Sequence, residues 1–230
     1  MNKSRLTRKR FLGLNILSGL LICLTLWISV VPLSARDVPP EVKAAAEEGY
    51  RSLLESIPPD ALSHFNLSNT DEVNQAVLGE GFRVHTIPPE SILSYDGKTS
   101  VHELILPTQI WFFPVMSRGR IRALLTVDKV GNEYKAVSIG GSGLALQWAS
   151  ALESASSGED GERVFVRVYQ AAADFVVISG AAGTKMAPLG AEMKERLKAA
   201  GGATLYDPAD IITGLRGPVK MTIDAARSMD

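Results

Sequence analysis

The sequence contains one cysteine and three histidines among 230 residues. The cysteine, Cys23, lies inside an apolar N-terminal run. The chain after that run therefore has no disulfide, no thiol nucleophile and no cysteine-ligated zinc. A body of this length can bury a core without disulfides, so their absence does not argue against a stable globular fold.

The three histidines, His64, His85 and His102, complete no metal-binding motif. His102-Glu103 lacks the second histidine, four residues away on one helix, that a zincin requires. If this segment is a strand, the side chains of His102 and Glu103 point to opposite faces. We therefore predict no metal site and no cofactor.

A basic excess is also missing from most of the chain. Of the 24 basic residues, five lie within the first ten positions, which leaves 19 basic against 25 acidic residues and a net charge of −6. A polyanion-binding protein shows a basic excess or a basic stripe. We therefore expect no nucleic acid partner.

The N-terminus has the layout of a secretory signal. Basic residues up to Arg10 precede an apolar run, Phe11 to Leu33, which has no charged residue and is followed by Ser34-Ala35. The basic end stays inside the cell, so the chain after residue 35 is expected outside the cytoplasm, in the periplasm, on the cell surface or secreted.

Two fates of residues 1–35 remain open. They form a signal peptide cleaved after Ala35, or a single membrane anchor, because residues 11–33 approach the roughly 20 residues that span a bilayer. A lipoprotein signal is disfavoured, since Leu21-Ile22 before Cys23 is too bulky for a lipobox. Contact with a membrane is expected only through residues 11–33.

Helices are predicted where apolar residues recur at helical spacing. Glu41 to Ile57 has an apolar face and ends at Pro58-Pro59, and a shorter helix is expected after Asn69 or Thr70. Two further helices are predicted over Leu144 to Ala155 and Ala191 to Ala200. The last thirty residues, broken at Asp207-Pro208 and Gly217-Pro218, are expected to cover the core rather than build it.

Strands are predicted from short apolar or β-branched runs bounded by turns. They cover Phe82 to Ile87, Gln109 to Met116, Arg120 to Val127, Glu133 to Ile139, Arg163 to Val168 and Phe175 to Ile178. Short glycine-containing turns at Ser117-Arg118-Gly119 and Val130-Gly131-Asn132 join three of them into an antiparallel meander. The predicted class is α+β, an antiparallel sheet packed by helices with an N-terminal signal or anchor helix. Residues 36–230 are predicted to form a single domain, with a possible boundary near residues 156–162.

Ser142 is the one candidate nucleophile. It follows a predicted strand and precedes a predicted helix, as the serine of an esterase does, but Leu144 stands where the second glycine of Gly-x-Ser-x-Gly belongs. The simpler interpretation is that glycines 140, 141 and 143 let the chain turn and Ser142 caps the helix. Gly180 to Lys185 (GAAGTK) partly resembles a phosphate-binding loop, but the spacing of its glycines and lysine does not fit that motif. We therefore predict an ordinary loop.

Acidic and aromatic side chains give weaker candidates. The carboxylates Asp96, Glu103, Asp128 and Asp174 are scattered, and the separation that a glycosidase pair requires is spatial. Four aromatic residues are predicted to form a core between the sheet and a helix: Trp111, Phe112, Phe113 and Trp148. Because side chains alternate along a strand, Trp111 and Phe113 share one face and Phe112 takes the other.

The stretch Trp111 to Gly141 (WFFPVMSRGRIRALLTVDKVGNEYKAVSIGG) resembles exported bacterial α+β proteins of uncharacterised function and, distantly, PepSY-type and propeptide-like inhibitory modules. The resemblance covers about a fifth of the chain and implies a non-catalytic, peptidase-modulating or envelope role. It carries no catalytic residue across, and this chain has no recognisable attached peptidase.

Two functions follow as hypotheses. The first is an exported, non-catalytic binding module of the cell envelope, whose partner is a protein, a peptide or an envelope component. This hypothesis predicts an exposed apolar patch or an open sheet edge. The alternative is a secreted hydrolase that uses Ser142 or a carboxylate pair, and it predicts that Ser142 or two acids meet a base such as His85 or His102.

Overall fold

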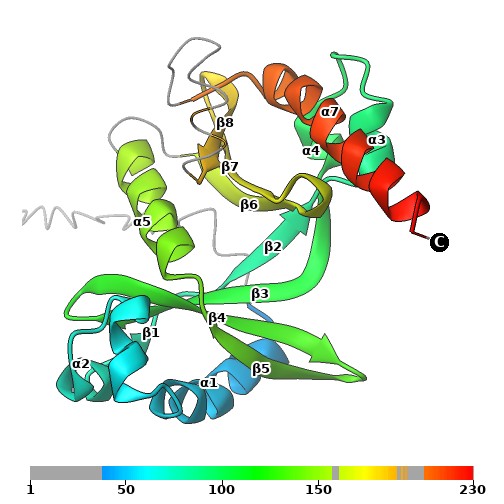
Figure 1. The fold of residues 1–230 in the computed structure, drawn as a ribbon. Coiled ribbons are helices and arrows are strands. Elements are labelled where there is room, and N and C mark those ends of the chain that lie inside the picture. Colours follow the sequence, from blue (N-terminus) through cyan, green and yellow to red (C-terminus); the bar gives the residue numbers. More distant parts are fainter. Residues whose placement is uncertain (1–37, 157–160, 191–192, 194, 196–204, 230) are drawn as a thin grey trace, which may run out of the picture. The chain divides into compact units, whose positions relative to one another are not determined.

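The structure is a computed structural model that describes residues 38–156, 161–190, 193, 195 and 205–229 (Figure 1). The predicted signal or anchor at residues 1–35 lies outside the described residues, as do most of the loop at 156–162 and most of the helix predicted over 191–200. Within the described ranges, no helix is both long enough and apolar enough to cross a membrane.

The described residues form an eight-stranded sheet with the order β5-β4-β3-β2-β6-β7-β8, and β1 pairs with one end of β3. Its strands are β1 (Val77–Leu78), β2 (Phe82–Thr86), β3 (Leu106–Ser117), β4 (Arg120–Val130), β5 (Glu133–Gly140), β6 (Glu162–Val168), β7 (Ala173–Gly180) and β8 (Gly183–Leu189). Helices pack on this sheet, so the predicted α+β class is confirmed.

The predicted meander is present as β3, β4 and β5, which pair in antiparallel order. Its first turn holds Arg118 and Gly119 at positive φ, and its second holds Gly131 at φ 64°. Turns with positive φ match the right-handed twist of the flanking strands, which explains why so short a connection suffices at both ends of β4.

The sheet is not antiparallel throughout, because β2 and β6 run parallel through the pairs Val84–Phe165 and His85–Val166. Parallel neighbours require a long crossover connection. Here β3, β4, β5 and three helices separate the two strands in the sequence, and together they supply that connection. Sequence periodicity does not reveal which distant strands become neighbours.

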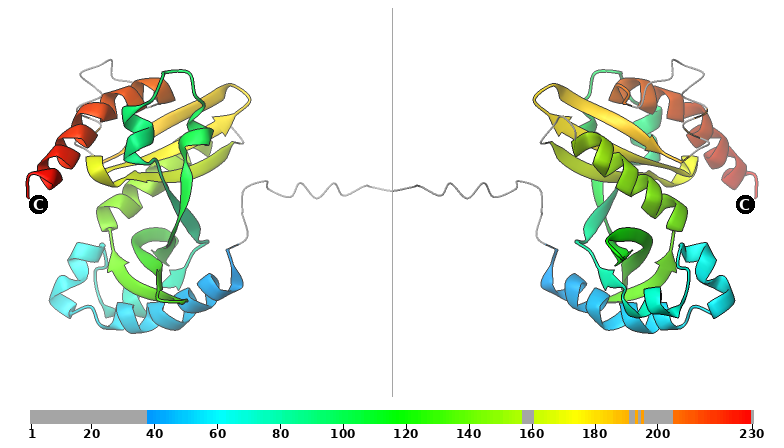
Figure 2. Two further views of the ribbon diagram at one scale, coloured as in Figure 1. Left: turned by 90° about the vertical axis from the view of Figure 1, so that its right-hand side faces the viewer. Right: turned by 90° about the vertical axis from the view of Figure 1, so that its left-hand side faces the viewer.

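The helices cover both faces of the sheet. They are α1 (Pro40–Glu55), η1 (Pro59–Phe65), α2 (Thr70–Asn74), α3 (Pro89–Leu93), α4 (Val101–Leu104), α5 (Ser142–Ser156), η2 (Tyr169–Ala171) and α7 (Pro208–Arg227). Figure 2 shows α1 against β3–β5 and α7 on the part of the fold formed by β6–β8.

Helix α1 covers one face of the meander with the apolar stripe that the sequence predicts. Val42, Ala46 and Leu54 are buried in one cluster with Trp111 and Phe113 of β3. The observed helix begins one residue before the predicted start and ends two residues before the predicted end at Ile57. Pro39 at its N-terminal boundary and Pro40 at its first position suit a helix start, where no backbone N–H is needed.

Helix α5 covers the opposite face and spans both halves of the sheet. Trp148 stacks on Phe82 with ring centroids 4.3 Å apart, and Phe165 meets both Trp148 and Phe112 edge to face. Phe112 therefore faces α5 while Trp111 and Phe113 face α1. The prediction that these aromatics form a sheet–helix core, divided by strand alternation, is confirmed.

The predicted break at Gly217-Pro218 is wrong, because Pro218 lies inside the single helix α7. A proline there cannot donate the helical bond to the carbonyl of Gly214 and costs about 3 kcal/mol. Ile211, Ile212, Leu215 and Val219 are all buried against the face of β6–β8 that α5 leaves free. Burial of four large apolar side chains outweighs the proline, at roughly 1.5–3 kcal/mol each.

Residues 180–185, predicted as a loop, belong instead to a hairpin. β7 ends at Gly180, β8 begins at Gly183, and these two glycines pair directly across the turn. Gly183 has φ 105°, a conformation that residues with a side chain disfavour, and this explains why the turn has glycine at this position. The phosphate-loop pattern here is a strand connection.

Gly49 sets the distance between α1 and β5. A methyl group on Gly49 would overlap the methyl group of Ala136, whereas Gly214 of α7 is exposed with open space around it. We expect Gly49→Ala to lower the free energy of unfolding by about 1–2 kcal/mol, because overpacking exceeds the gain in helix propensity.

The matched control is Gly214→Ala, which we expect to raise the free energy of unfolding by up to about 1 kcal/mol through helix propensity alone. Urea unfolding followed by circular dichroism measures both. Ala136→Gly should restore the stability that Gly49→Ala removes. Equal effects of the two glycine substitutions would show that α1 does not pack on β5 in this way.

Candidate functional site

Ser142 is the first residue of α5, as its predicted position between strand and helix requires. Its hydroxyl donates a hydrogen bond of 2.6 Å to the backbone carbonyl of His64 in η1. A nucleophilic serine instead donates its proton to a base. The Ser142 hydroxyl therefore links η1 to the start of α5. The group that accepts its hydrogen bond is a peptide carbonyl, which cannot take up the proton as a base would.

The other two histidines lie on different elements from Ser142. His85 is a buried residue of β2 whose Nδ1 is 3.1 Å from the carbonyl oxygen of Arg83. His102 lies in the four-residue helix α4 and not on a strand. The short helix forms because the side chain of Ser100 accepts a hydrogen bond from the N–H of His102.

The serine whose hydroxyl contacts a histidine ring was not predicted from the sequence. The Nε2 atom of His102 lies 2.9 Å from the Ser179 hydroxyl and 3.2 Å from that of Thr184. A serine and an imidazole at this distance are the first two members of a nucleophilic site, but catalysis also requires a group that orients the base. No carboxylate contacts Nδ1 of His102 within the described ranges. The contact therefore docks α4 on the β7–β8 hairpin.

Two of the four candidate carboxylates, Asp96 and Glu103, belong to a turn and to the first turn of a short helix. Asp96 accepts hydrogen bonds from the backbone N–H groups of Thr99 and Lys98, and these bonds lower the pKa of the Asp96 carboxyl. Glu103 lies in the first turn of α4. An ionised acid held in its own turn suits the geometry of a loop rather than proton transfer.

The remaining two, Asp128 of β4 and Asp174 of β7, approach the same tyrosine from the two halves of the sheet. Desolvation raises the pKa of the Tyr169 phenol, Arg167 lowers it, and the charges of Asp128 and Asp174 raise it further. Asp174 is bound at both oxygens by Arg167, with distances of 2.7 and 2.9 Å. Both oxygens are therefore engaged, which leaves Asp174 poorly suited to act as a general acid.

Arg167 has a packing role as well. Its guanidinium lies 5.4 Å from the ring centre of Phe112 and 5.8 Å from that of Phe165, and the bond to Asp174 raises the pKa of Arg167 further. Phe112 belongs to β3 and Phe165 to β6. Arg167 thus covers the end of the aromatic core where the two halves of the sheet meet.

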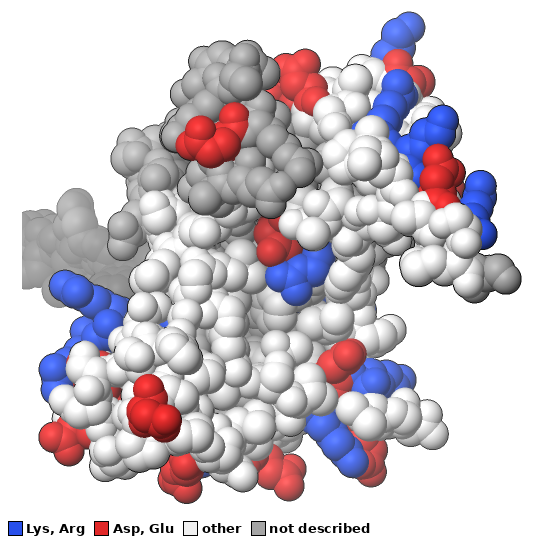
Figure 3. Space-filling view, viewed as in Figure 1, with Lys and Arg blue, Asp and Glu red and all other residues white. Residues whose placement is uncertain are grey.

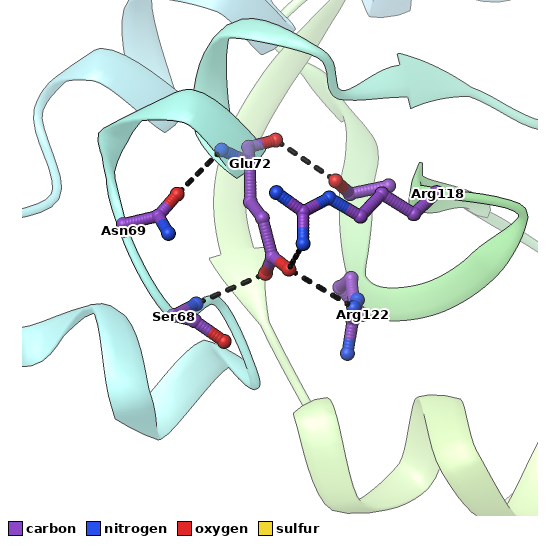
Figure 4. A network of polar contacts seen from close by, with 6 residues as sticks. Ser68, Asn69, Glu72, Arg118 and Arg122 are labelled. Carbon is purple, nitrogen blue, oxygen red and sulfur yellow. Dashed lines mark hydrogen bonds and ion pairs between the residues drawn. The ribbon is translucent and has the colours of Figure 1, made fainter.

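Glu72 is the most buried charged side chain of the described residues, with 2% of its surface exposed. Its carboxylate accepts a hydrogen bond of 3.0 Å from the Ser68 N–H and pairs with Arg118 at 3.2 Å and Arg122 at 3.4 Å (Figure 4). The Ser117 hydroxyl donates to the Glu72 carbonyl at 3.0 Å. This network holds α2 against the turn between β3 and β4.

The same contacts fix the charge of Glu72. The hydrogen bond from Ser68 lowers its pKa, burial acts in the opposite direction, and the charges of Arg122 and Arg118 lower it further. A carboxylate with this many donors is stabilised as the anion. It therefore suits a structural clamp, and one of its partners, Arg118, lies in the β3–β4 turn at a φ of 52°.

An open sheet edge is the feature that the binding hypothesis predicts. β5 and β8 are the two ends of the strand order. β8 is partly paired, since Met186 and Tyr206 exchange two backbone hydrogen bonds of 2.9 Å. No described residue pairs with the outer side of β5. Alternate residues of β5 therefore direct backbone donors and acceptors to the outside.

Residues of this strand also line a groove of about 920 Å³. It lies between α1 and the β4–β5 hairpin, and it reaches along the first half of β5 as far as Ala136. Small side chains and a glycine line its α1 side, together with two acids. These residues are Glu41, Ala44, Ala45, Glu48 and Gly49. Gly49 and Ala136 meet closely at one end, which closes the groove there.

Two other hollows lack such an edge. One of about 560 Å³ lies on the other side of α1, beside Leu78 and Phe113, and one of about 330 Å³ lies between η2 and α7. Neither is lined by β5 or β8. The groove beside β5 is therefore the candidate binding site, and we call it the β5 groove.

Charge is mixed around the hairpin that borders the β5 groove. Figure 3 shows acidic and basic side chains interspersed at the end of the β4–β5 hairpin, at the lower right. Lys135 and Glu133 of this hairpin form an ion pair of 3.4 Å. Val130 and Val137, 50% and 43% exposed, add apolar surface beside the charges.

Comparison of the chain with family models, with curated proteins and with solved structures finds no match.

The Glu72 clamp predicts a pH dependence of stability. A group whose pKa is lowered in the folded state stabilises the fold above its ordinary value of 4.5, and the stabilisation disappears as the pH falls through the folded-state pKa. We expect Glu72→Gln to lower the urea midpoint at pH 7. The difference from the wild type should shrink below about pH 4.5.

The control is Glu80→Gln, because Glu80 is exposed. It should leave the midpoint nearly unchanged at both pH values. If the deficit of Glu72→Gln is the same at pH 3 and pH 7, the carboxylate charge contributes nothing to the clamp.

Proposed function

We propose that this chain is an exported, non-catalytic binding module of the cell envelope that holds an extended peptide segment as an additional strand on β5. The observation that supports it is the unpaired β5 edge with the β5 groove beside it. An extended peptide added to a sheet edge gains main-chain hydrogen bonds from the strand and specificity from pockets for alternate side chains. The β5 edge supplies the main-chain hydrogen bonds, and the β5 groove supplies the pocket for side chains.

The first half of β5 is the part that suits a partner strand. Glu133, Tyr134, Lys135 and Ala136 pair regularly with β4, and each of them lines the β5 groove. The register then shifts, and Val137 has no partner in β4. A bulge of this kind bends an edge and disfavours pairing beyond it. The bound segment is therefore short and centred on residues 133–136.

Tyr134 is positioned to bond to such a segment. The two-residue turn at Gly131 and Asn132 is closed by the pair Val130–Glu133, and the closing pair of such a turn is hydrogen-bonded. Hydrogen-bonded and non-bonded pairs alternate along an antiparallel ladder. Tyr134, opposite Lys129, consequently directs its backbone N–H away from β4 and toward a partner.

Export is the second part of the proposal, and it is supported by the sequence of residues 1–35. The basic start, the uncharged run 11–33 and the small residues at its exit favour delivery to the membrane with the rest of the chain outside. A chain that leaves the cytoplasm loses access to cytoplasmic nucleotides, which agrees with a module that binds protein segments.

A proline in place of Tyr134 tests the edge. Proline has no N–H and is tolerated on edge strands, so Tyr134→Pro removes the outward donor while leaving the β4–β5 pairs. The probe is a fluorescein-labelled heptapeptide of alternating valine and threonine. We expect it to bind the wild type in fluorescence anisotropy, and Tyr134→Pro to weaken binding by about tenfold or more, the equivalent of one main-chain bond to a buried partner.

Tyr134→Ala is the matched control, because it removes the same side chain and its hydrogen bond to Gln109 but keeps the backbone N–H. It should bind the peptide more tightly than Tyr134→Pro does. Hydrogen exchange supplies an independent measurement, since the peptide should protect β5 amides and leave those of α5 unchanged. Equal binding by both variants, or protection outside β5 alone, would contradict strand addition.

The export proposal predicts the location and the first residue of the mature protein. In a bacterial host, mass spectrometry of the fractions should find either a soluble periplasmic form beginning at Arg36 or an intact form in the membrane. The first outcome means a cleaved signal and the second a retained anchor. An intact chain beginning at Met1 in the cytoplasmic fraction would contradict export.

A further inference from the structure

We infer that the segment held on β5 carries basic side chains, lysine or arginine, at the alternate positions that face α1. This inference rests on the proposed function and names the chemistry of its partner. It follows from the direction of side chains along β5, from the charges that line the β5 groove and from the size of the residues between them.

Alternation decides which side chains enter the groove. Tyr134 and Ala136 belong to the face of β5 that packs toward α1. Side chains of a strand added beside β5 continue the same two faces, so every second side chain of the partner points to the α1 side. These side chains enter the β5 groove, and the intervening ones point away from it.

The charges that meet them are acidic on the α1 side. Glu41 and Glu48 line the groove there, both exposed, and no basic residue of α1 does. Lys43 pairs with Glu47 at 3.8 Å, and neither of these residues lines the β5 groove. No ion pair among the described residues uses Glu41 or Glu48. Both are therefore available to a cation from a partner.

The opposite wall does not reverse this balance. Lys135 is offset by its ion pair with Glu133, at 3.4 Å. Lys129 is the one further base on that wall, against two acids on α1. The groove thus presents a net negative charge to the side chains that enter it.

The floor favours long side chains with an apolar stem. Ala44 and Ala45 leave space between the helix and the hairpin, whereas Gly49 and Ala136 close the groove at one end. Lysine and arginine place their methylene stems on apolar surface while their charged ends reach polar groups. A short acidic side chain would bring its charge close to Glu48 without filling this space.

The spacing allows two such contacts at once. Glu41 and Glu48 are seven residues apart, about 10.5 Å along a helix axis. Alternate residues of an extended segment lie about 6.8 Å apart. Two basic side chains at positions i and i+2, each several ångströms long, can therefore approach both glutamates.

Two heptapeptides test the inference in fluorescence anisotropy with the purified protein. One alternates valine with lysine and the other alternates valine with glutamate, each labelled with fluorescein. We expect the lysine peptide to bind about fivefold to tenfold more tightly, the range expected for two exposed ion pairs. Its advantage should fall as the salt concentration rises, because exposed charges are screened.

Charge reversal on α1 supplies matched variants. Glu48→Lys should remove or reverse the preference for the lysine peptide, because it replaces a groove acid by a base. Glu47→Lys makes the same change at the neighbouring position outside the groove and should keep the preference. A preference that Glu47→Lys abolishes and Glu48→Lys preserves would overturn the assignment to the groove.

Failure of the inference and failure of the proposed function are distinguishable. If both peptides bind equally and protect β5 amides from exchange, the preference for basic residues is wrong and strand addition stands. Tighter binding of the glutamate peptide also overturns the inference alone. If neither peptide binds nor protects β5 amides, strand addition itself is wrong, and the inference falls with it.

Discussion

The alternation of side chains along β3 is the constraint on which the rest of the structure depends. Trp111 and Phe113 face α1, while Phe112, between them, faces α5. A single strand thereby anchors two cores on opposite sides of one sheet. A shift of register by one residue would exchange these faces and bury neither set correctly. The positions of α1 and α5 on the sheet follow from this alternation.

The candidate binding edge depends on the same arrangement. Because α1 is committed to the face of the meander that holds Trp111, it lies beside β5 without pairing with its edge. The close approach of Gly49 to Ala136 fixes the helix at one end, and the helix and strand leave the β5 groove between them. Core packing thus positions a wall of the candidate site, and Ala45 belongs both to the core and to the lining of the groove.

The sequence predicts well those parts of the fold whose contacts are local. The three strands β3–β5 were recognisable because apolar runs alternate with turns at Gly119 and Gly131 that need positive φ. The amphipathic pattern of α1 predicted both the helix and its buried face. By contrast, β8 was missed because glycine and alanine around the turn at 180–183 give no strand signal. Pro218 suggested a break that burial of Leu215 and Val219 overrides.

Sites formed by distant residues were less accessible. The contact of His102 with Ser179 joins positions 77 residues apart, and the sequence offers no sign of it. The binding hypothesis predicted an open edge as a class of feature. It did not identify β5 as that edge, because the order of strands depends on the parallel pairing of β2 with β6. That order emerges only in three dimensions.

This parallel pairing has a consequence for how the chain assembles. The meander β3–β5 and the hairpins of β6–β8 join neighbours in sequence, whereas Thr86 and Arg167, whose hydrogen bond ties β2 to β6, are 81 residues apart. Closing a long loop carries an entropic cost that short hairpins avoid. The two halves can therefore form locally before the seam between β2 and β6 closes. Because a chain is synthesised from its N-terminus, the β5 edge can be complete while the second half is still being made.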